Sequence, residues 1–204
     1  EFYDIGPEFG LRARMRQREV PAGYYELLER LYARNIWPDI EEHPELTLLR
    51  PAASTAYEET ERVGIQVYAA LSSFVGGKMR VTDLEGGNHV MRGLHYPVGG
   101  ESKEHKDSNL LTVLPEPGSE LELLVNGEWV SFPVPETRDY AVINGGEMTH
   151  MRYGIPATRH RVSSVKRYRI TAPLFLHGRV HLRLGSTGKR IGDYLNRIFI
   201  ANSG

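Results

Sequence analysis

Residues 109–134, "NLLTVLPEPGSELELLVNGEWVSFPV", decide the fold because short apolar and β-branched runs alternate there with turn residues. Within them, Asn126-Gly127 lies between alternating apolar residues, the strongest short-range signal for a tight β-hairpin. Similar runs recur outside the stretch, at residues 89–97, 139–144, 160–165 and 167–176. Short strands with hairpin punctuation predict an antiparallel sandwich or barrel, of which the double-stranded β-helix, or jelly roll, is one solution.

The regions on either side of the β-rich part show helical patterns. Apolar residues recur at the three-and-four spacing of an amphipathic helix in residues 18–35 and again in residues 55–73. We therefore expect one domain over residues 1–204 that is mainly β with flanking helices. Its helical first part, about residues 1–80, would pack on one sheet of a jelly-roll core over about residues 88–178, and a C-terminal helix would follow over about residues 188–201.

Composition excludes several classes of protein. The 204 residues include 25 basic and 26 acidic side chains, interspersed, so we expect no nucleic-acid partner. No apolar run reaches the ~20 residues of a spanning helix, so we expect no membrane insertion. Cysteine is absent, so any metal would be held by nitrogen and oxygen ligands. The first residues show no signal-peptide pattern, so a cytoplasmic location is the default, although a missing N-terminus would have removed such a signal.

A histidine and an aspartate stand two residues apart at the entrance to the buried run. On an extended strand, residues two apart point to the same side, so His105 and Asp107 can face one point while Lys106 points away. An unpaired carboxylate is costly beside an apolar strand unless a partner neutralises it. Two ligands of one cation would satisfy this requirement.

A third ligand should come from an adjacent strand. His160 stands out, because it begins the run "HRVSSV" and follows His105 at a distance that accommodates several intervening strands. The other candidates are the remaining histidines, His43, His89, His95, His150, His177 and His181.

Two imidazoles and one carboxylate on one face of an octahedral metal leave three positions open, which is the arrangement of non-haem Fe(II) oxygenases. The alternative is a structural role, because a His-x-Asp pair often occurs without a metal. A lone histidine in a strand is also usually a hydrogen-bonded core or surface residue.

Four stretches in the right order carry a resemblance to a known family: "GLHYP" at 93–97, "HKDSNLLTVL" at 105–114, residues 121–154, and "RHRVSS" with "RYRITAPLFL" within residues 159–176. The chain resembles the Fe(II) and 2-oxoglutarate-dependent oxygenases of the isopenicillin N synthase-like group. The resemblance covers nearly the whole chain. Full-length members carry a longer segment before the point where this sequence begins. Either that segment precedes Glu1, or this protein is a shorter relative in which part of one sheet would be unpaired.

The resemblance implies a role for six residues. His105, Asp107 and His160 would hold the iron. Arg169 would pair with the distal carboxylate of 2-oxoglutarate, since a planar guanidinium is permanently charged and can grip a carboxylate bidentately. Thr171, where the family usually has serine, would add a hydroxyl, and Tyr96 matches a tyrosine that reaches the co-substrate in relatives.

These assignments have structural alternatives. Arg169 stands in a basic stretch and could be an exposed strand residue. Thr171 could simply favour a β-strand, and Tyr96 could be a core aromatic.

The function implied is an Fe(II)- and 2-oxoglutarate-dependent dioxygenase that uses dioxygen to oxidise, most often by hydroxylation, a C–H bond of a small-molecule metabolite. Two alternatives remain: an Fe(II)-dependent oxidase or cyclase of the same fold that does not use 2-oxoglutarate, and a non-catalytic jelly-roll binding module.

The substrate contacts are less defined than the metal ligands. Polar residues that could contact substrate are Arg92, Lys106, Arg152 and Tyr153, each of which could also be solvated surface. For His89, His95 and His150 we favour structural roles, with the alternative that one of them lines the substrate pocket.

Overall fold

The computed structural model describes residues 2–7, 22–24, 26–27, 34–135 and 139–202. Its strands are β1 (Phe2–Ile5), β2 (Val90–Tyr96), β3 (Ser102–His105), β4 (Leu111–Pro115), β5 (Leu121–Val125), β6 (Glu128–Ser131), β7 (Ala141–Gly145), β8 (His160–Val162), β9 (Arg169–Thr171) and β10 (Leu174–Leu176). Its α-helices are α2 (Leu49–Leu71), α3 (Glu147–Tyr153) and α4 (Ile191–Asn202). Short 3-10 helices lie at Ala22–Tyr24, Pro44–Leu46, Ser72–Val75, Val81–Asp83 and Gly185–Thr187.

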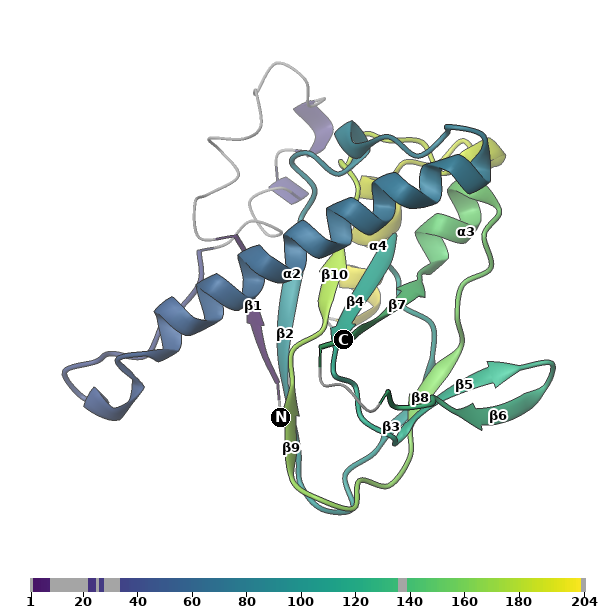
Figure 1. The fold of residues 1–204 in the computed structure, drawn as a ribbon. Coiled ribbons are helices and arrows are strands. Elements are labelled where there is room, and N and C mark those ends of the chain that lie inside the picture. Colours follow the sequence, from purple (N-terminus) through teal and green to yellow (C-terminus); the bar gives the residue numbers. More distant parts are fainter. Residues whose placement is uncertain (1, 8–21, 25, 28–33, 136–138, 203–204) are drawn as a thin grey trace.

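The strands form two antiparallel sheets (Figure 1). The larger sheet has the order β1-β2-β10-β4-β7, with β9 also pairing with β2. The smaller sheet has the order β3-β8-β5-β6. In both sheets, strands distant in sequence are neighbours, as β10 is to β2 and β8 is to β3. This is the predicted jelly roll.

Helix α2 crosses the outer face of the larger sheet (Figure 1). A Cβ atom added at Gly64 would lie 2.5 Å from Leu176 and 2.9 Å from Val113, so the helix approaches β10 and β4 closely only because this residue has no side chain. Tyr68 of the same helix is fully buried in the main hydrophobic core. The prediction that helices pack on one sheet is confirmed.

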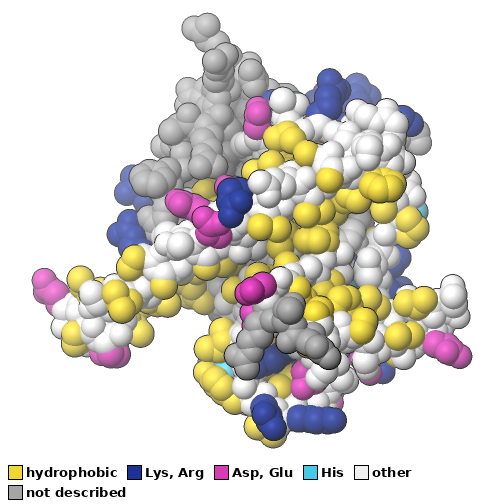
Figure 2. All heavy atoms as spheres, in the orientation of Figure 1, with side chains coloured by type: hydrophobic (Ala, Val, Ile, Leu, Met, Phe, Trp, Pro, Cys, Tyr) yellow, Lys and Arg dark blue, Asp and Glu magenta, His cyan; other side chains and the backbone are white. Residues whose placement is uncertain are grey.

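Several large apolar side chains remain exposed near the ends of α2, including Ile40, Leu48 and Phe74. Hydrophobic and charged side chains of both signs are interspersed over the face shown in Figure 2. Within α2 itself, Tyr57, Gly64 and Tyr68 are buried, so the helix is an outer layer with one buried face. Among the described residues, no helix is long and apolar enough to cross a membrane.

The structure differs from the expected helical first part of the chain. Residues Phe2–Ile5 form strand β1, which pairs with β2, although about residues 1–80 were expected to be helical. The helix expected over 18–35 lies mostly outside the described residues. Helix α2 begins at Leu49, before the expected start at Thr55, because Pro51 fits the first turn of a helix, where no backbone N–H is needed.

The β-rich part also differs in two details. Strand β3 was not expected, because Ser102–His105 has a charged and polar sequence with no apolar alternation. Residues 167–176 were expected as one strand, but they form β9 and β10, separated at Ala172-Pro173. A proline cannot donate to a sheet ladder, and both short strands pair with β2 on either side of the break.

Candidate metal centre

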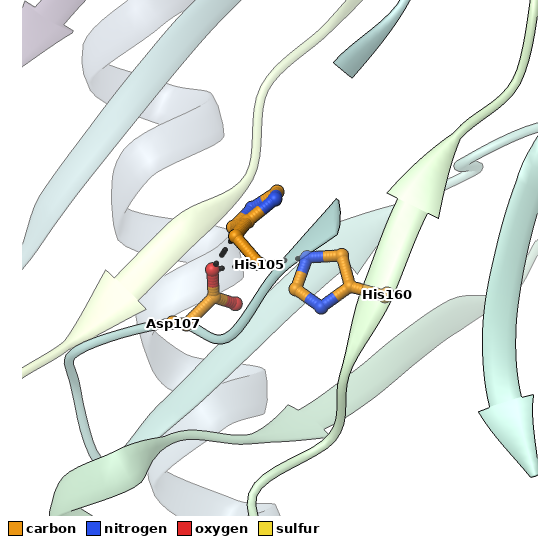
Figure 3. A group of neighbouring side chains, drawn as sticks. All are labelled: His105, Asp107 and His160. Carbon is orange, nitrogen blue, oxygen red and sulfur yellow. Dashed lines mark ion pairs between the residues drawn. The ribbon is translucent and has the colours of Figure 1, made fainter. Parts of the chain in front are cut away.

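Two strands and one connection bring three side chains together at one point. His105 ends β3, His160 begins β8, and the two residues are direct partners across the smaller sheet. Asp107 lies in the connection that leads from β3 to β4 (Figure 3). Each residue offers one nitrogen or oxygen atom, and these three atoms lie within 4.8 Å of one another. The predicted ligand triad therefore converges, although His105 and Asp107 do not share one strand.

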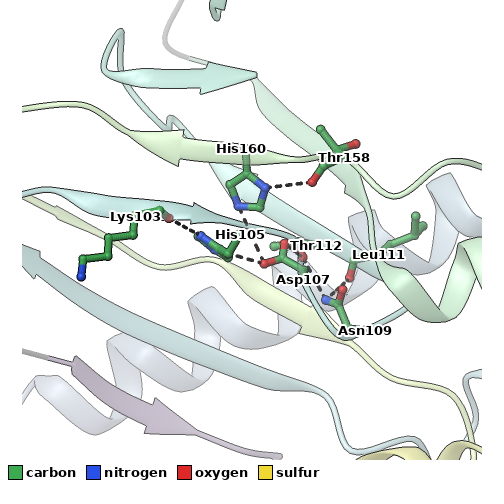
Figure 4. A network of polar contacts seen from close by, with 8 residues as sticks. All are labelled: Lys103, His105, Asp107, Asn109, Leu111, Thr112, Thr158 and His160. Carbon is green, nitrogen blue, oxygen red and sulfur yellow. Dashed lines mark hydrogen bonds and ion pairs between the residues drawn. The ribbon is translucent and has the colours of Figure 1, made fainter. Parts of the chain in front are cut away.

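Backbone carbonyls orient the two imidazoles. Nδ1 of His105 lies 2.7 Å from the carbonyl oxygen of Lys103, and Nδ1 of His160 lies 3.2 Å from that of Thr158 (Figure 4). Nδ1 therefore donates in both rings, which leaves Nε2 as the atom with a free lone pair. The Nε2 atoms lie 3.6 Å (His105) and 3.8 Å (His160) from Oδ1 of Asp107, too far for a hydrogen bond. The three atoms face one another without bonding.

A polar chain holds the Asp107 carboxylate from behind (Figure 4). The Thr112 hydroxyl donates to Oδ2 of Asp107 at 2.5 Å. Asn109 Nδ2 donates to the Thr112 hydroxyl and to the carbonyl oxygen of Leu111, both at 2.9 Å. The side chains of Asp107, Asn109 and Thr112, which form this hydrogen-bonded network, are all buried. The carboxylate therefore has one oxygen fixed and the other directed at the histidines.

The first turn of α3 fixes the backbone of the same connection. The N–H groups of Glu147 and Met148 donate to the carbonyl oxygens of Asp107 and Asn109, at 2.8 and 3.1 Å. These two N–H groups have no acceptor within their own helix, so the hydrogen bonds satisfy the donors of α3 and the carbonyl oxygens of the connection. A Cβ atom at Gly146 would collide with the Asn109 carbonyl oxygen, so this close approach requires glycine.

Burial and charge suit a cation at this point. The side chains of Asp107 and His160 are 6% and 7% exposed, whereas that of His105 is 44% exposed. Burial lowers the pKa of His160, although the negative charge of Asp107 opposes this effect. A neutral imidazole is the form that binds a metal. The site is therefore closed around Asp107 and open to solvent beside His105.

The residues expected to hold 2-oxoglutarate also lie together. Arg169 and Thr171 of β9 face Tyr96 and Leu94 of β2 across the ladder. The Arg169 guanidinium lies over the Tyr96 ring, 5.1 Å from its centre. Nε and Nη1 of Arg169 and the hydroxyl of Thr171 are buried and have no hydrogen-bond partner among the described residues. Burial also raises the pKa of Tyr96, so its hydroxyl stays protonated.

Packing connects this group to the metal triad. Tyr96 and Val162 belong to one small buried cluster with Val165. Val162 lies two residues after His160 on β8, so both side chains point to the interior between the sheets. Arg169 and the triad therefore line the same interior.

The side chains present fit both an iron ion and a carboxylate co-substrate. Two imidazole nitrogens and one carboxylate oxygen on one side of a point form the donor set of non-haem Fe(II) sites. Buried donors without partners are rare in folded proteins, and those on Arg169 and Thr171 match the oxygen atoms of a carboxylate.

The other residues expected near substrate have different surroundings. Arg92 on β2 forms a two-point ion pair with Asp4 of β1, at 2.6 and 2.8 Å, and Lys106 is exposed. Arg152 and Tyr153 both donate to the buried carboxylate of Asp83, at 3.0 and 2.9 Å. These two residues therefore belong to a buried structural network.

The remaining histidines have varied positions. His89 is buried, with Nδ1 3.0 Å from Glu61 and Nε2 3.1 Å from the carbonyl oxygen of His177. The ring of His95 packs on that of Tyr168, with 5.1 Å between the ring centres, and His150 is exposed on α3. None of the three belongs to the metal group found among the described residues.

Sequence reasoning missed the residues that support the ligands. Thr112 and Asn109 could have been noticed, because they are polar residues inside an apolar run. Glu120, whose carboxylate lies 3.7 Å from Arg169, has no sequence signal, because it is one of several acidic residues near β5.

Comparison with known proteins agrees with the geometry. Residues 87–178 match the model of the 2OG-Fe(II) oxygenase superfamily. No curated protein sequence matches the chain. A solved structure from Caulobacter crescentus, described as a 2OG-Fe(II) oxygenase family protein, is 22% identical with a TM-score of 0.72, and the match covers 98% of this chain and 69% of that one.

A second similar structure is a full-length protein of Neurospora crassa in complex with alpha-KG, which is 18% identical with a TM-score of 0.72. That match covers 98% of this chain and 65% of the Neurospora chain, so this chain spans slightly less than two thirds of that protein. At these identities the structural similarity establishes the fold, and the family match lies on the residues that form the site. The segment of the chain that carries the triad is therefore similar to the 2OG-Fe(II) oxygenase superfamily.

Proposed function

We propose that this protein is an Fe(II)- and 2-oxoglutarate-dependent dioxygenase that hydroxylates a C–H bond of a small-molecule metabolite. The observation that carries the proposal is the convergence of His105, Asp107 and His160 within 4.8 Å, in the interior that also holds the unpartnered donors of Arg169 and Thr171. A binding module without catalysis would have no need for this combination.

Each of these residues would have its own role in the site. His105, Asp107 and His160 would hold Fe(II). Arg169 would hold the distal carboxylate of 2-oxoglutarate with the help of the Thr171 hydroxyl, and the Tyr96 ring would keep the guanidinium in place. When bound, iron would bring dioxygen, the oxidant, together with 2-oxoglutarate: one oxygen atom would convert 2-oxoglutarate to succinate and carbon dioxide, and the other would go to the substrate C–H bond.

The substrate would enter from the side of His105. The His105 ring is the most exposed side chain of the triad, whereas Asp107 and His160 are buried. Burial on the opposite side keeps water from the reacting centre. Support for a small-molecule substrate comes from the Neurospora protein, whose structures include complexes with thymine and with 5-formyluracil.

An anaerobic titration tests the proposal. Fe(II) and then 2-oxoglutarate are added to the metal-free protein, and the weak visible charge-transfer absorption of the keto acid on iron is followed. We expect the band in the wild type. In Arg169→Ala, saturation should need about 10- to 100-fold more 2-oxoglutarate, because a charge-assisted hydrogen bond contributes about 1.5–3 kcal/mol.

Arg62→Gln is the matched control, because Arg62 is exposed on α2 and pairs with Glu59. It should saturate like the wild type. Iron binding without the band would favour the oxidase that does not use 2-oxoglutarate, and absence of iron binding would contradict the metal site. Succinate formation in air, with Asp107→Ala as the inactive variant, then separates an enzyme from a binding module.

A further inference from the structure

We propose that Glu120 is the resident counter-ion of Arg169, and that its negative charge opposes the binding of the distal carboxylate of 2-oxoglutarate. This inference rests on the proposed function, since it assumes that Arg169 receives the co-substrate. Glu120 is then a positioning residue that sets how tightly the pocket holds 2-oxoglutarate.

The distance between Glu120 and Arg169 leaves the hydrogen-bond donors of Arg169 available to a ligand. Oε2 of Glu120 lies 3.7 Å from Nη1 of Arg169, and both side chains are only 17% exposed. At that distance the charges attract, but no hydrogen bond forms, so Nη1 and Nε of Arg169 keep their donor capacity. Glu120 therefore neutralises Arg169 without occupying its hydrogen-bonding face.

The connection between β4 and β5 holds Glu120 in this position. The carbonyl oxygen of Glu120 accepts hydrogen bonds from the N–H and the hydroxyl of Ser163, at 2.9 and 3.3 Å. Gly118 has a left-handed φ of 81°, and a Cβ atom there would collide with Nη1 of Arg169 and lie 3.0 Å from Oε2 of Glu120. The chain thus folds closely over the ion pair, which fixes both groups near each other.

The energetic consequence follows from charge. A buried guanidinium without a partner is unfavourable, so Glu120 stabilises Arg169 while the pocket is empty. When a second carboxylate arrives, two anions share one cation, and like charges at short range repel. Removal of the Glu120 charge should therefore strengthen binding of any ligand that carries the distal carboxylate.

Binding measurements on the intact protein test this inference. Protein loaded anaerobically with Fe(II) is titrated with 2-oxoglutarate in a calorimeter, and the dissociation constants of wild type and Glu120→Gln are compared. We expect a decrease on the order of tenfold in the variant, the size of a short-range charge effect in a partly buried site. A second ligand, 2-oxovalerate, has the same keto acid but a methyl group in place of the distal carboxylate, and its dissociation constant should stay the same.

Two further variants make the comparison specific. Glu122→Gln is the matched control, because Glu122 lies two residues away and pairs with Arg161 at 2.6 Å. It should leave the affinity for 2-oxoglutarate unchanged. In an Arg169→Gln background, Glu120→Gln should no longer tighten binding.

The outcomes separate this inference from the proposed function. Wild-type binding of 2-oxoglutarate with equal or weaker binding by Glu120→Gln would overturn the role of Glu120 and leave the proposed function standing. Equal tightening of 2-oxovalerate would also overturn it. Failure of the iron-loaded wild type to bind 2-oxoglutarate would overturn both. If Glu120→Gln does not fold, Glu120→Met replaces it, and failure of both to fold would show that Glu120 serves the fold and not the affinity.

Discussion

Thr112 and Asp107 form a hydrogen bond that divides the carboxylate into two different oxygen atoms. Oδ2 accepts from the Thr112 hydroxyl at 2.5 Å, and Oδ1 faces the Nε2 atoms of His105 and His160. This arrangement explains how an acidic side chain can stand at the entrance to a buried strand. One oxygen is satisfied by the strand itself, and the other is available to a cation.

Replacement of Thr112 should weaken metal binding. Thr112→Val keeps the shape but removes the donor to Asp107, so we expect about a 10- to 100-fold loss of Fe(II) affinity, the usual cost of losing a residue that orients a ligand. Thr112→Ser should retain most of the affinity. The measurement is a competition titration against a coloured chelator. Thr149→Val is the control, because its buried hydroxyl donates to the carbonyl oxygen of Leu110 and touches no ligand. Equal losses in both valine variants would contradict the prediction.

Replacement of Gly146 should disturb both folding and the metal centre. In Gly146→Ala the new methyl group would collide with the backbone of Asn109, so α3 must move away from the Asp107 connection. We expect about 1–3 kcal/mol of destabilisation in urea unfolding, together with weaker Fe(II) binding. Gly93→Ala is the control, because the nearest atom to its Cβ would be 3.6 Å away. An unchanged Gly146→Ala protein would show that α3 does not hold this connection.

The Asp83 network should matter for stability and not for iron. Asp83 is buried and accepts from Arg152 and Tyr153, and the Tyr153 hydroxyl also bonds to that of Tyr68 on α2. Asp83→Ala leaves the Arg152 charge without its carboxylate, so we expect about 3–5 kcal/mol of lost stability in urea unfolding. The exposed pair of Glu59 and Arg62 offers a control, and Glu59→Ala should cost less than about 1 kcal/mol. Loss of iron affinity in folded Asp83→Ala protein would argue against a purely structural role.

His177 should make the protein less stable in mild acid. Burial, with a smaller effect of His89, lowers the pKa of His177 to about 4 from its ordinary value of 6.5. The unfolded chain therefore binds this proton at a higher pH than the folded protein does. Stability contributed by neutral His177 is complete above pH 6.5 and decreases as the pH falls toward 4, by up to about 3 kcal/mol.

Urea unfolding at about pH 7.5 and about pH 4.5, on either side of the ordinary histidine pKa, measures this effect. His177→Gln should lose less stability between the two pH values than the wild type. His43→Gln replaces an exposed histidine and should follow the wild type. Parallel losses in wild type and His177→Gln would refute the assignment to His177.

The sequence predicted the two-sheet core from local signals, and it predicted that His105, Asp107 and His160 would come together, although six other histidines stayed open for the third position. The alternation in residues 109–134 and the Asn126-Gly127 turn are visible without tertiary structure, and β5 and β6 pair around that turn. Strand β3 gave no such signal, because its pairing with β8 is decided by a strand that comes much later in the chain.

The interactions that support the candidate site could not be predicted from the sequence either. Gly146 meets Asn109, and Glu120 meets Arg169, only after the strands have been brought together. Strand β1 is a related case, because its four residues form a strand where β2 offers an edge, although no pattern in "FYDI" requires one.

The position of the triad gives the metal a mechanical consequence. His105 and His160 belong to the smaller sheet, and Asp107 lies on the crossing to β4 of the larger sheet. An ion that bonds to all three would therefore cross-link the smaller sheet to the connection that enters the larger sheet. Since the unfolded chain does not assemble this triad, part of the binding free energy becomes resistance of the barrel to opening.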